Sequence, residues 1–567
     1  MRVLGVNAVF HDPAAALVAD GEIVAAAEEE RFSRRKHGKT PVPFSTWELP
    51  EQAMRFCLRH AGIEPADLDA VAYSYDPARA PRPGSDLTAE GWEGLRTLFA
   101  ERAPRFLATA LPGLDPARVR FVPHHVAHAA SAARAAGWES CAVLTLDGRG
   151  ERTAHLAGIL RDGRLEVLAE SELPNSLGLR YEELTEHLGF RRSSDEYKVM
   201  AMASYGTPAH LDAFRSLLRA DGSGRMRTDP VDWARFAPAL RPDGDWTPAH
   251  ADLAATVQRR LEEVLVELAG WLHERTGETR LALAGGVALN CVANSRIWRE
   301  SPFEEVWVQP ASGDSGTALG AALEVAAELG DGGPAGVFPM RTAALGREWD
   351  EHELAAWLRT AAVAFDRPAD VAEEVAATLA ADGVVAWFQG RSEFGPRALG
   401  HRSLLADPRD PRNTERLNDV KGREQFRPVA PMVLAQRAAD LFDGGPIPSP
   451  FMLFTHGVRP EWRERIPAVV HVDGTARIQT VDAAAEPLVA RMLQAFERRT
   501  GVPVVVNTSL NTAGRPMVDD PRDALECFGS APVDLLAIGP FVVRRPRSAA
   551  AHDGRANGAH AGEVVAR

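Results

Sequence analysis

Two histidines, His124 and His128, lie four residues apart in the segment 123–130. On an α-helix this spacing places both imidazoles on one face, as binding of a divalent metal requires. Asp147 ends a hydrophobic run nineteen residues later, and Asp314 follows another such run. Imidazoles and carboxylates in an incompletely filled coordination sphere favour non-haem iron or a similar metal over a structural zinc. The alternative is that both histidines are ordinary loop and helix residues.

Composition and charge limit the kind of protein that carries these residues. With 567 residues the chain is too long for one hydrophobic core, which predicts about two to four domains. The net charge of −14 argues against a dedicated nucleic-acid binder, since phosphate contacts need clustered Lys and Arg. Four widely spaced cysteines without CxxC pairs fit a reducing cytoplasm. No stretch approaches the roughly 18 uncharged apolar residues of a membrane span, so we expect a cytoplasmic protein.

The elements that must position the histidines include an internal repeat. Residues 3–27 read as apolar strands joined by a turn, and the same pattern recurs at 142–168. Asp147 falls in the second copy where Asn7 falls in the first. Two such copies are typical of the duplicated α/β domain of the actin–hexokinase–Hsp70 superfamily, which has a cleft between its halves.

A helix and a glycine-containing turn follow the second copy. The apolar spacing over 253–272 predicts an amphipathic helix that stops at Gly277. Residues 281–290 read as a buried strand that turns on Gly285 and Gly286 into a helix. Glycines at such a turn let backbone amides approach a phosphate or an adenosine. A purely structural role for the two glycines is equally compatible with the sequence.

Proline and glycine mark the boundary between two domains. Residues 331–346 are rich in both and predict a linker. We therefore expect a first domain over 1–340 and a second α/β domain over 341–546. Residues 547–567 have no periodicity and predict a disordered tail.

The second domain contains a locally basic segment, 391–427, with nine Lys or Arg against six acids. Glycine and proline alternate with these residues, and rigid turns that present Arg suit a phosphate-bearing small molecule. The alternative is a solvated, ion-paired surface. The basic residues are Arg391, Arg397, Arg402, Arg409, Arg412, Arg416, Lys421, Arg423 and Arg427.

Two later segments have a similar polar character. Arg477 lies in the alternating segment 473–480, and Ser509 ends the apolar strand that begins at Val504. Hydroxyl and amide groups at a strand end often orient a ligand. For Ser509 a simple strand-end cap is an equally good interpretation.

Together with further short motifs, these residues resemble the antibiotic O-carbamoyltransferases of the nodulation and cephamycin type (NodU/CmcH), a group similar to the enzyme that carbamoylates tobramycin. The resemblance covers about residues 1–545. The motifs that carry it are Phe10-His11-Asp12, Glu28-Glu29-Glu30-Arg31-Phe32, Lys36-His37-Gly38, His124-His125-Val126-Ala127-His128, Leu146-Asp147-Gly148-Arg149-Gly150, Asp195-Glu196-Tyr197-Lys198-Val199-Met200, Gly285-Gly286-Val287-Ala288-Leu289-Asn290 and Glu393-Phe394-Gly395-Pro396-Arg397.

The resemblance implies a two-step activity on two domains. A YrdC-like C-terminal domain would condense carbamoyl phosphate with ATP and Mg²⁺ into carbamoyladenylate, releasing pyrophosphate. An actin-like N-terminal domain, similar to the threonylcarbamoyl transferase that modifies tRNA, would hold one divalent metal, with Fe²⁺ expected. There the carbamoyl group would pass to a hydroxyl of a small-molecule acceptor, releasing AMP. A homodimer is also expected.

The resemblance also assigns roles to individual residues. His11 would act at the acceptor hydroxyl as a base or an orienting group, and Lys36 would stabilise charge at the transferred carbamoyl group. The metal ligands would be His124, His128, Asp147 and Asp314. Nucleotide contacts in the N-terminal domain would come from Lys198, Gly285, Gly286 and Asn290. Carbamoyl phosphate and ATP would contact Arg397, Lys421, Arg427, Met452, Arg477 and Ser509.

The acceptor and the alternatives stay open at this point. Some relatives carry an acid just before the position of His11, whereas Val9 and Phe10 precede it here. This difference favours a neutral acceptor, such as a deoxysugar or an ansamycin-type polyketide, over an aminoglycoside. The alternative functions are an actin-like kinase or ATPase, a tRNA threonylcarbamoyl transferase and a non-catalytic metal-binding protein.

Overall fold

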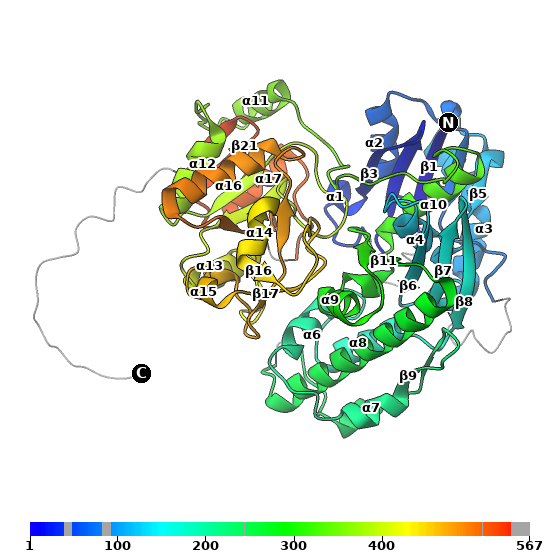
Figure 1. The fold of residues 1–567 in the computed structure, drawn as a ribbon. Helices are drawn as coiled ribbons and strands as arrows, with labels where there is room; N and C mark the ends of the chain where they lie inside the picture. The colour runs from blue at the N-terminus through cyan, green and yellow to red at the C-terminus, as the bar shows by residue number, and fades with distance from the viewer. Residues whose placement is uncertain (39–47, 82–91, 243, 513, 546–567) are drawn as a thin grey trace, which may run out of the picture.

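The protein is described here from a computed structural model that covers residues 1–38, 48–81, 92–242, 244–512 and 514–545 (Figure 1). Two lobes lie side by side. We call the part from β1 to α10 the N-terminal lobe and the part from α11 to β22 the C-terminal lobe. The domain boundary at 340 and 341 stays a prediction, and the predicted tail over 547–567 lies outside the described residues.

The N-terminal lobe contains two five-stranded sheets with the same topology. One has the order β3-β2-β1-β4-β5 and the other has the order β8-β7-β6-β11-β12. In each sheet the first strand pairs antiparallel with the second and parallel with the fourth of its copy. The strands are β1 (Arg2–Asn7), β2 (Ala14–Ala19), β3 (Glu22–Glu28), β4 (Ala70–Tyr73), β5 (Val119–Phe121), β6 (Cys141–Leu146), β7 (Thr153–Arg161), β8 (Arg164–Glu172), β11 (Arg280–Ala284) and β12 (Glu305–Val308). The predicted duplication of an α/β unit, as in the actin-like fold, is confirmed.

Two helices, α4 (His124–Ala133) and α10 (Ser315–Glu328), pack on each other between the two sheets. The main strand contacts of α10 are with β1, β2 and β4, and those of α4 are with β6, β7 and β11. The contact between the two helices is unusually close at Gly320. A Cβ atom at this position would lie 1.7 Å from the carbonyl oxygen of Ala127, so only glycine fits. This close packing fixes α4, which carries His124 and His128, relative to Asp314 at the start of α10.

Further helices surround these sheets. The predicted amphipathic helix is observed as α8 (Pro248–Thr276), which ends at Gly277 in a left-handed C-cap. The other helices of the lobe are α1 (Glu30–Ser33), α2 (Glu51–Ala61), α3 (Trp92–Ala110), α5 (Leu177–His187), α6 (Glu196–Ala203), α7 (Leu211–Leu217) and α9 (Cys291–Glu300), and a small sheet joins β9 (Leu218–Ala220) to β10 (Met226–Thr228).

The segment 331–346, predicted as a linker, has no helix or strand, but part of it packs against the N-terminal lobe. Phe338 and Leu345 are buried in the core of the N-terminal lobe. The backbone N–H of Phe338 donates to the carbonyl of Arg134 at 2.8 Å, and that of Met340 donates to Ala135 at 2.9 Å. The proline and glycine content therefore correctly indicated irregular backbone. The apolar residues of the same segment anchor this backbone to the N-terminal lobe.

The C-terminal lobe is built on a mixed seven-stranded sheet with the order β19-β15-β20-β14-β13-β21-β22. Its strands are β13 (Val385–Phe388), β14 (Arg402–Ala406), β15 (Ala430–Leu434), β19 (Gln479–Val481), β20 (Val504–Ser509), β21 (Leu535–Ile538) and β22 (Phe541–Arg544). Helices α11 (Glu351–Thr360), α12 (Val371–Ala380), α13 (Arg412–Val420), α14 (Ala435–Leu441), α15 (Pro460–Arg463), α16 (Pro487–Thr500) and α17 (Pro521–Ser530) pack around it, with the short strands β16 (Phe442–Asp443), β17 (His456–Val458) and β18 (Thr475–Ala476). The α/β class is confirmed, and the likeness to the YrdC fold stays a prediction.

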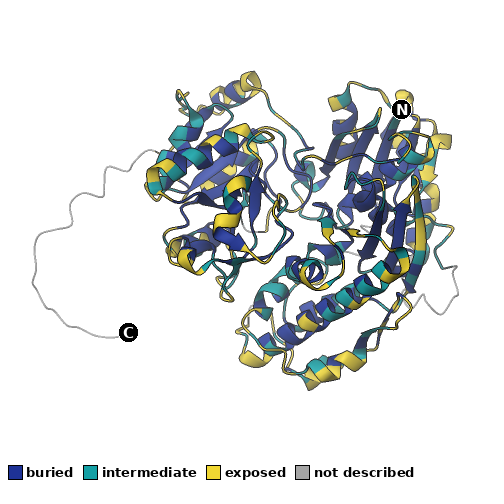
Figure 2. Ribbon diagram, in the orientation of Figure 1, coloured by how far each residue is buried: buried dark blue, intermediate teal, exposed yellow. Residues whose placement is uncertain are grey.

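Burial follows this layering in both lobes. Figure 2 shows most strands as buried and the edge strand β8 as partly exposed, and it places the other exposed residues mainly on the outer faces of the helices and in loops. Within the described ranges, no helix has the length and the apolar character needed to cross a membrane.

A buried ion pair joins the two lobes. Arg31 donates through Nη2 to the carbonyl of Gly395 at 2.7 Å and through Nε to Glu28 at 3.3 Å. Glu28 in turn accepts the backbone N–H of Gly395 at 2.6 Å. Burial raises the pKa of the Glu28 carboxyl to about 7, although the Arg31 charge opposes this shift.

Arg31→Ala should destabilise the protein by about 3–5 kcal/mol, because it leaves the Glu28 carboxylate buried without its cation. The loss should grow as the pH rises through about 7, where the carboxyl of Glu28 becomes charged, and shrink below it. Urea unfolding on either side of that pH measures both effects. Arg55→Ala, which breaks an exposed pair with Glu51 at 3.0 Å, should cost less than about 1 kcal/mol. Equal losses for the two variants would contradict the prediction.

Candidate active site

His124, His128, Asp147 and Asp314 form one buried cluster in the N-terminal lobe. One ligand atom from each of them lies within 4.8 Å of the others. The Nε2 atoms of His124 and His128 lie 3.3 and 3.6 Å from Asp147 Oδ2. Asp314 Oδ1 lies 3.6 Å from both Nε2 atoms. The structure thus brings together the four residues predicted to hold a metal.

Backbone amides from other predicted motifs orient the two carboxylates of this cluster. Asp147, directly after β6, accepts the N–H of Gly286 at 3.1 Å through Oδ1. Asp314, directly before α10, accepts the N–H of His11 at 3.0 Å through Oδ2. Outer hydrogen bonds of this kind fix the direction of a ligating oxygen. Each carboxylate keeps its other oxygen on the side of the two imidazoles.

The chemistry of the cluster fits a divalent metal. Both ring nitrogens of His128 are buried without a hydrogen-bond partner among the described residues, and such groups are costly unless something fills the space. Burial raises the pKa of Asp147, but the neighbouring imidazoles outweigh burial and hold it well below its usual range. Two imidazoles and two carboxylates suit a borderline metal such as iron.

We expect the purified protein to bind about one divalent ion per chain, because only this cluster combines two imidazoles with two carboxylates among the described residues. His128→Ala should lose most of the bound metal, since even a residue that only orients a metal ligand typically accounts for about 10–100-fold in affinity. Elemental analysis after dialysis measures the stoichiometry. His60→Ala, an exposed histidine on α2, is the matched control. Full metal content in His128→Ala would rule out the assignment.

A cavity of about 490 Å³ opens beside the cluster, and we call it the metal-side cavity. Asp147 and Asp314 form part of its wall together with His11, Gly286 and Asn290. Three of the predicted N-terminal site residues therefore share a space with the cluster. Asn290 also has a structural task, since its side chain accepts the N–H of Ala293 at 3.1 Å and caps α9.

Gly285 lines neither of the two cavities described here. It has a φ of +89°, and a Cβ atom would lie 2.1 Å from the carbonyl oxygen of Leu146. Glycine is required there because the turn passes so close to β6. The turn continues as the 3₁₀ helix η5 (Gly286–Leu289), so the helix predicted directly after the glycines begins only at Cys291.

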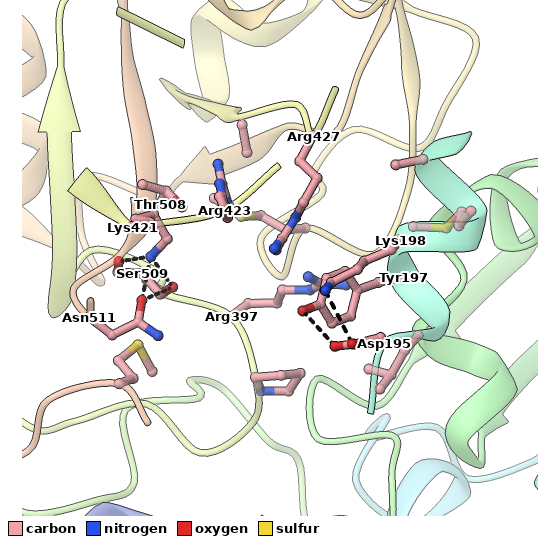
Figure 3. A pocket seen from close by; sticks show the side chains of 18 of the residues that line it. Asp195, Tyr197, Lys198, Arg397, Lys421, Arg423, Arg427, Thr508, Ser509 and Asn511 are labelled. Carbon is pink, nitrogen blue, oxygen red and sulfur yellow. Dashed lines mark hydrogen bonds and ion pairs between the residues drawn. The ribbon is translucent and has the colours of Figure 1, made fainter. Parts of the chain in front are cut away.

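A second cavity of about 430 Å³ lies between the lobes, and we call it the basic cavity. All six residues predicted to bind carbamoyl phosphate or ATP line it, and Lys36 and Lys198 join them from the N-terminal lobe. Figure 3 shows Arg397, Arg423 and Arg427 directed into one space, with Lys421 on one side and Tyr197 and Lys198 on the other. The six residues are Arg397, Lys421, Arg427, Met452, Arg477 and Ser509.

Two buried cations of the basic cavity have no counter-charge among the described residues, whereas Lys198 and Arg427 both pair with Glu424. Neither Arg397 nor Arg477 forms an ion pair within the described residues, and the Nε atom of each is buried without a hydrogen-bond partner. Burial, and after it the neighbouring Arg477, lower the pKa of Arg397 to about 9. Burial and Arg427 act in the same way on Arg423, whose pKa is also about 9. An anion bound here would relieve both the desolvation and the repulsion.

Other lining residues are already fixed by partners. The Lys421 ammonium donates to Ser509 Oγ at 2.9 Å and to the side chain of Asn511 (Figure 3). Lys198 pairs with Asp195 at 3.1 Å and with Glu424 of the other lobe at 2.7 Å. Lys198 and Lys36 thus face the basic cavity and are absent from the wall of the metal-side cavity.

The two cavities share part of their wall. Residues from both lobes belong to both linings, which places the two predicted half-sites next to each other. The shared residues are Asp12, His37, Ser194, Tyr197, Met200, Leu289, Gly313, Pro396 and Arg397.

Sequence reasoning assigned no role to several of the lining residues. Arg423 belongs to the basic segment, and Asn511 follows two residues after Ser509, so their neighbours in the chain were the available signal. His37 belongs to a motif that carries the resemblance, yet only Lys36 of that motif received a role. Ser194 had no signal, since a serine before a helix is common.

Comparison with known proteins identifies the family. Residues 2–80 and 106–323 match the model of the carbamoyltransferase N-terminus, and residues 376–545 match that of the carbamoyltransferase C-terminus. The chain therefore belongs to the carbamoyltransferase family and is a carbamoyltransferase. Family membership implies a carbamoyl donor and a small-molecule acceptor.

Two similar proteins match nearly the whole chain, and a third matches three quarters of it. The nodulation protein NolNO of Sinorhizobium fredii is 38% identical over 565 residues, which span 96% of this chain and 81% of that protein. An uncharacterized protein of Synechocystis is 36% identical and spans 96% of this chain and 97% of its own length. The nodulation protein NolO of Bradyrhizobium diazoefficiens is 40% identical over 75% of this chain and 79% of its own.

Proposed function

We propose that the protein makes carbamoyladenylate in the basic cavity and transfers its carbamoyl group to an acceptor hydroxyl in the metal-side cavity. The observation that carries this proposal is a set of buried, unpaired Arg side chains in a cavity that shares a wall with the histidine–aspartate cluster. A kinase transfers a phosphoryl group in one site. It would therefore need neither a separate basic cavity nor a wall that this cavity shares with the metal-side cavity.

The first step uses the cations of the basic cavity. Water would cleave carbamoyl phosphate to carbamate and phosphate, and a carbamate oxygen would then attack the α-phosphorus of ATP and expel pyrophosphate. Each substrate is a polyanion, so Arg397, Arg423 and Arg477 would bind and orient both. Mg²⁺ bound to the nucleotide would also neutralise part of the negative charge on the leaving pyrophosphate.

The second step uses the metal-side cavity. His124, His128, Asp147 and Asp314 would hold a divalent metal, which supplies a Lewis acid for the adenylate phosphate when bound. The amides of His11 and Gly286 hold the two carboxylates, so they set the geometry of the site. Passage through the common wall would keep the mixed anhydride away from bulk water.

For the acceptor we propose a hydroxyl of an antibiotic or related natural product, with a sugar or polyketide hydroxyl favoured. The metal-side cavity has apolar walls from Phe10, Val287 and Leu289 as well as polar ones. Two of its acids are less available to an amine, because Glu182 is paired with Arg192 at 2.9 Å and burial raises the pKa of Glu196 to about 7. A neutral polyhydroxyl compound fits this lining better than a polycation such as tobramycin.

The test incubates the protein with carbamoyl phosphate, ATP and Mg²⁺, without an acceptor. We expect phosphate and pyrophosphate in equal amounts and a carbamoyladenylate mass. D-glucose, N-acetyl-D-glucosamine and tobramycin then serve as acceptor probes, and mass spectrometry reports the carbamate ester and AMP. ADP as the nucleotide product would refute the proposal and favour a kinase. Dependence on bicarbonate and threonine would favour threonylcarbamoylation. Fe²⁺, a homodimer and a cytoplasmic location stay predictions.

A further inference from the structure

Asp12, His37 and Ser194 form a hydrogen-bonded chain in the wall between the two cavities. The Nδ1 atom of His37 lies 2.9 Å from Asp12 Oδ1, and its Nε2 atom lies 2.9 Å from Ser194 Oγ. A hydroxyl, an imidazole and a carboxylate in this order are the arrangement that activates a serine in hydrolases, where geometry rather than chain position identifies it. Neither the metal cluster nor the cations of the basic cavity use these three side chains.

The surrounding structure holds this chain in place at the cost of backbone strain. Asp12 has a φ of +44° and His37 a φ of +63°, in the left-handed region that non-glycine residues seldom adopt. The Asn7 amide donates to the carbonyl of Asp12 at 3.0 Å, and the His37 N–H donates to Glu30 at 2.8 Å. Strain that neighbours enforce in this way tends to cluster at functional sites.

Asp12 also links the chain to His11. Its second oxygen, Oδ2, lies 3.2 Å from His11 Nδ1, so one carboxylate contacts both imidazoles. With Nδ1–H of His37 directed at Asp12, the Nε2 atom of His37 is left to accept the Ser194 hydroxyl proton. The lone pairs of Ser194 Oγ are then available to a donor in either cavity, because Ser194 lines both.

We propose that Ser194 and His37, positioned by Asp12, take up the proton of the acceptor hydroxyl during carbamoyl transfer. This inference rests on the proposed function. As the acceptor oxygen bonds to the carbamoyl carbon, its proton moves to Ser194 Oγ and the Ser194 proton moves to His37 Nε2. The bond between the carbamoyl carbon and the phosphate oxygen breaks, AMP leaves, and His37 later returns its proton to water. His37 accepts the proton, Ser194 relays it and Asp12 is a positioning residue.

The first test needs no acceptor and therefore does not depend on the proposed function. A fluorophosphonate, which reacts with activated serine hydroxyls, is added to the intact protein, and peptide mapping reads the labelled residues. We expect Ser194 to be labelled at least about tenfold faster than Ser193, and at least about tenfold slower in His37→Ala and His37→Gln. His60→Ala should behave as the wild type. Labelling of Ser194 that equals that of Ser193, or that persists unchanged without His37, would overturn the proposal.

The second test follows transfer to methanol, a small hydroxyl probe, as methyl carbamate. His37→Ala should slow this product by about 10²-fold or more, and added imidazole should restore part of the rate. Pyrophosphate release reports the first step separately, so its absence in the wild type would refute the proposed function, whereas unchanged labelling of Ser194 in His37→Ala would refute the relay alone. A carbamoyl group found on Ser194 itself, or a second bound metal that His37→Ala removes, would also overturn the proposal.

Discussion

Arg397→Ala is expected to lower pyrophosphate release from carbamoyl phosphate and ATP by about 10²–10³-fold, the usual loss when one buried electrostatic donor is removed from an active site. Arg397 is buried in the wall that both cavities share, and it has no ion pair within the described residues. Its charge is therefore available to the phosphates. Arg397→Lys should retain only part of the rate, because an ammonium lacks the planar fork of the guanidinium.

The folded protein should tolerate this change, which separates a lost function from a lost fold. In the ligand-free state the Arg397 cation is desolvated and lies near Arg477, so burial and repulsion both lower its pKa to about 9. Removing it should leave the thermal unfolding temperature unchanged or raise it. Arg522→Ala, which breaks only an exposed pair with Glu526 at 2.9 Å, is the matched control for activity. Pyrophosphate release in Arg397→Ala at the wild-type rate would place the first step elsewhere.

His128→Ala is expected to abolish carbamoyl transfer while pyrophosphate release continues. His128 belongs to the cluster of the metal-side cavity and lines neither cavity itself, so its effect should pass through the metal. Loss of one ligand removes the Lewis acid that compensates charge on the leaving AMP, which contributes several kcal/mol, or about 10³-fold or more. Carbamoyladenylate should then accumulate on the protein.

Mass spectrometry of the bound nucleotide and of the carbamate ester measures the two steps in one experiment. His60→Ala is the control, since this exposed histidine lines neither cavity. If His128→Ala stops pyrophosphate release as well, the two cavities do not divide the reaction as proposed. If it keeps full transfer, the cluster has no part in the second step.

Arg397→Ala and His128→Ala together would test whether the two steps of the reaction take place in different cavities. Arg397→Ala should lose both products because transfer needs carbamoyladenylate, whereas His128→Ala should lose only the second. The Ser194–His37 relay predicts the same pattern for His37→Ala as for His128→Ala, but with the metal retained. Elemental analysis therefore distinguishes a lost ligand from a lost proton acceptor.

Local patterns in the sequence were sufficient to predict the parts that depend on neighbours along the chain. The spacing of His124 and His128 determined a shared helix face, because the α-helix repeats every 3.6 residues. The repeated strand–turn pattern predicted the duplicated sheets, and the apolar spacing over 253–272 predicted α8. Motif order alone indicated the carbamoyltransferase family, which the family match over both lobes confirms.

Contacts between distant segments were decided only by the tertiary structure. Asp147 and Asp314 meet the histidines because β6 ends where α10 begins, and Gly320 lets α10 approach α4 closely enough. The basic cavity gains Lys36 and Lys198 from the other lobe.

Two further features also depend on tertiary packing. Gly285 allows its turn to approach β6 and lines neither of the two described cavities, and apolar side chains anchor the predicted linker. His37 contacts both Asp12 and Ser194. The backbone of His37 and of Asp12 is left-handed, and no sequence pattern predicts this conformation at either residue. Periodicity and turn chemistry are local and can be read from residue types. Contacts between segments more than a hundred residues apart depend on tertiary packing, which no local sequence pattern encodes.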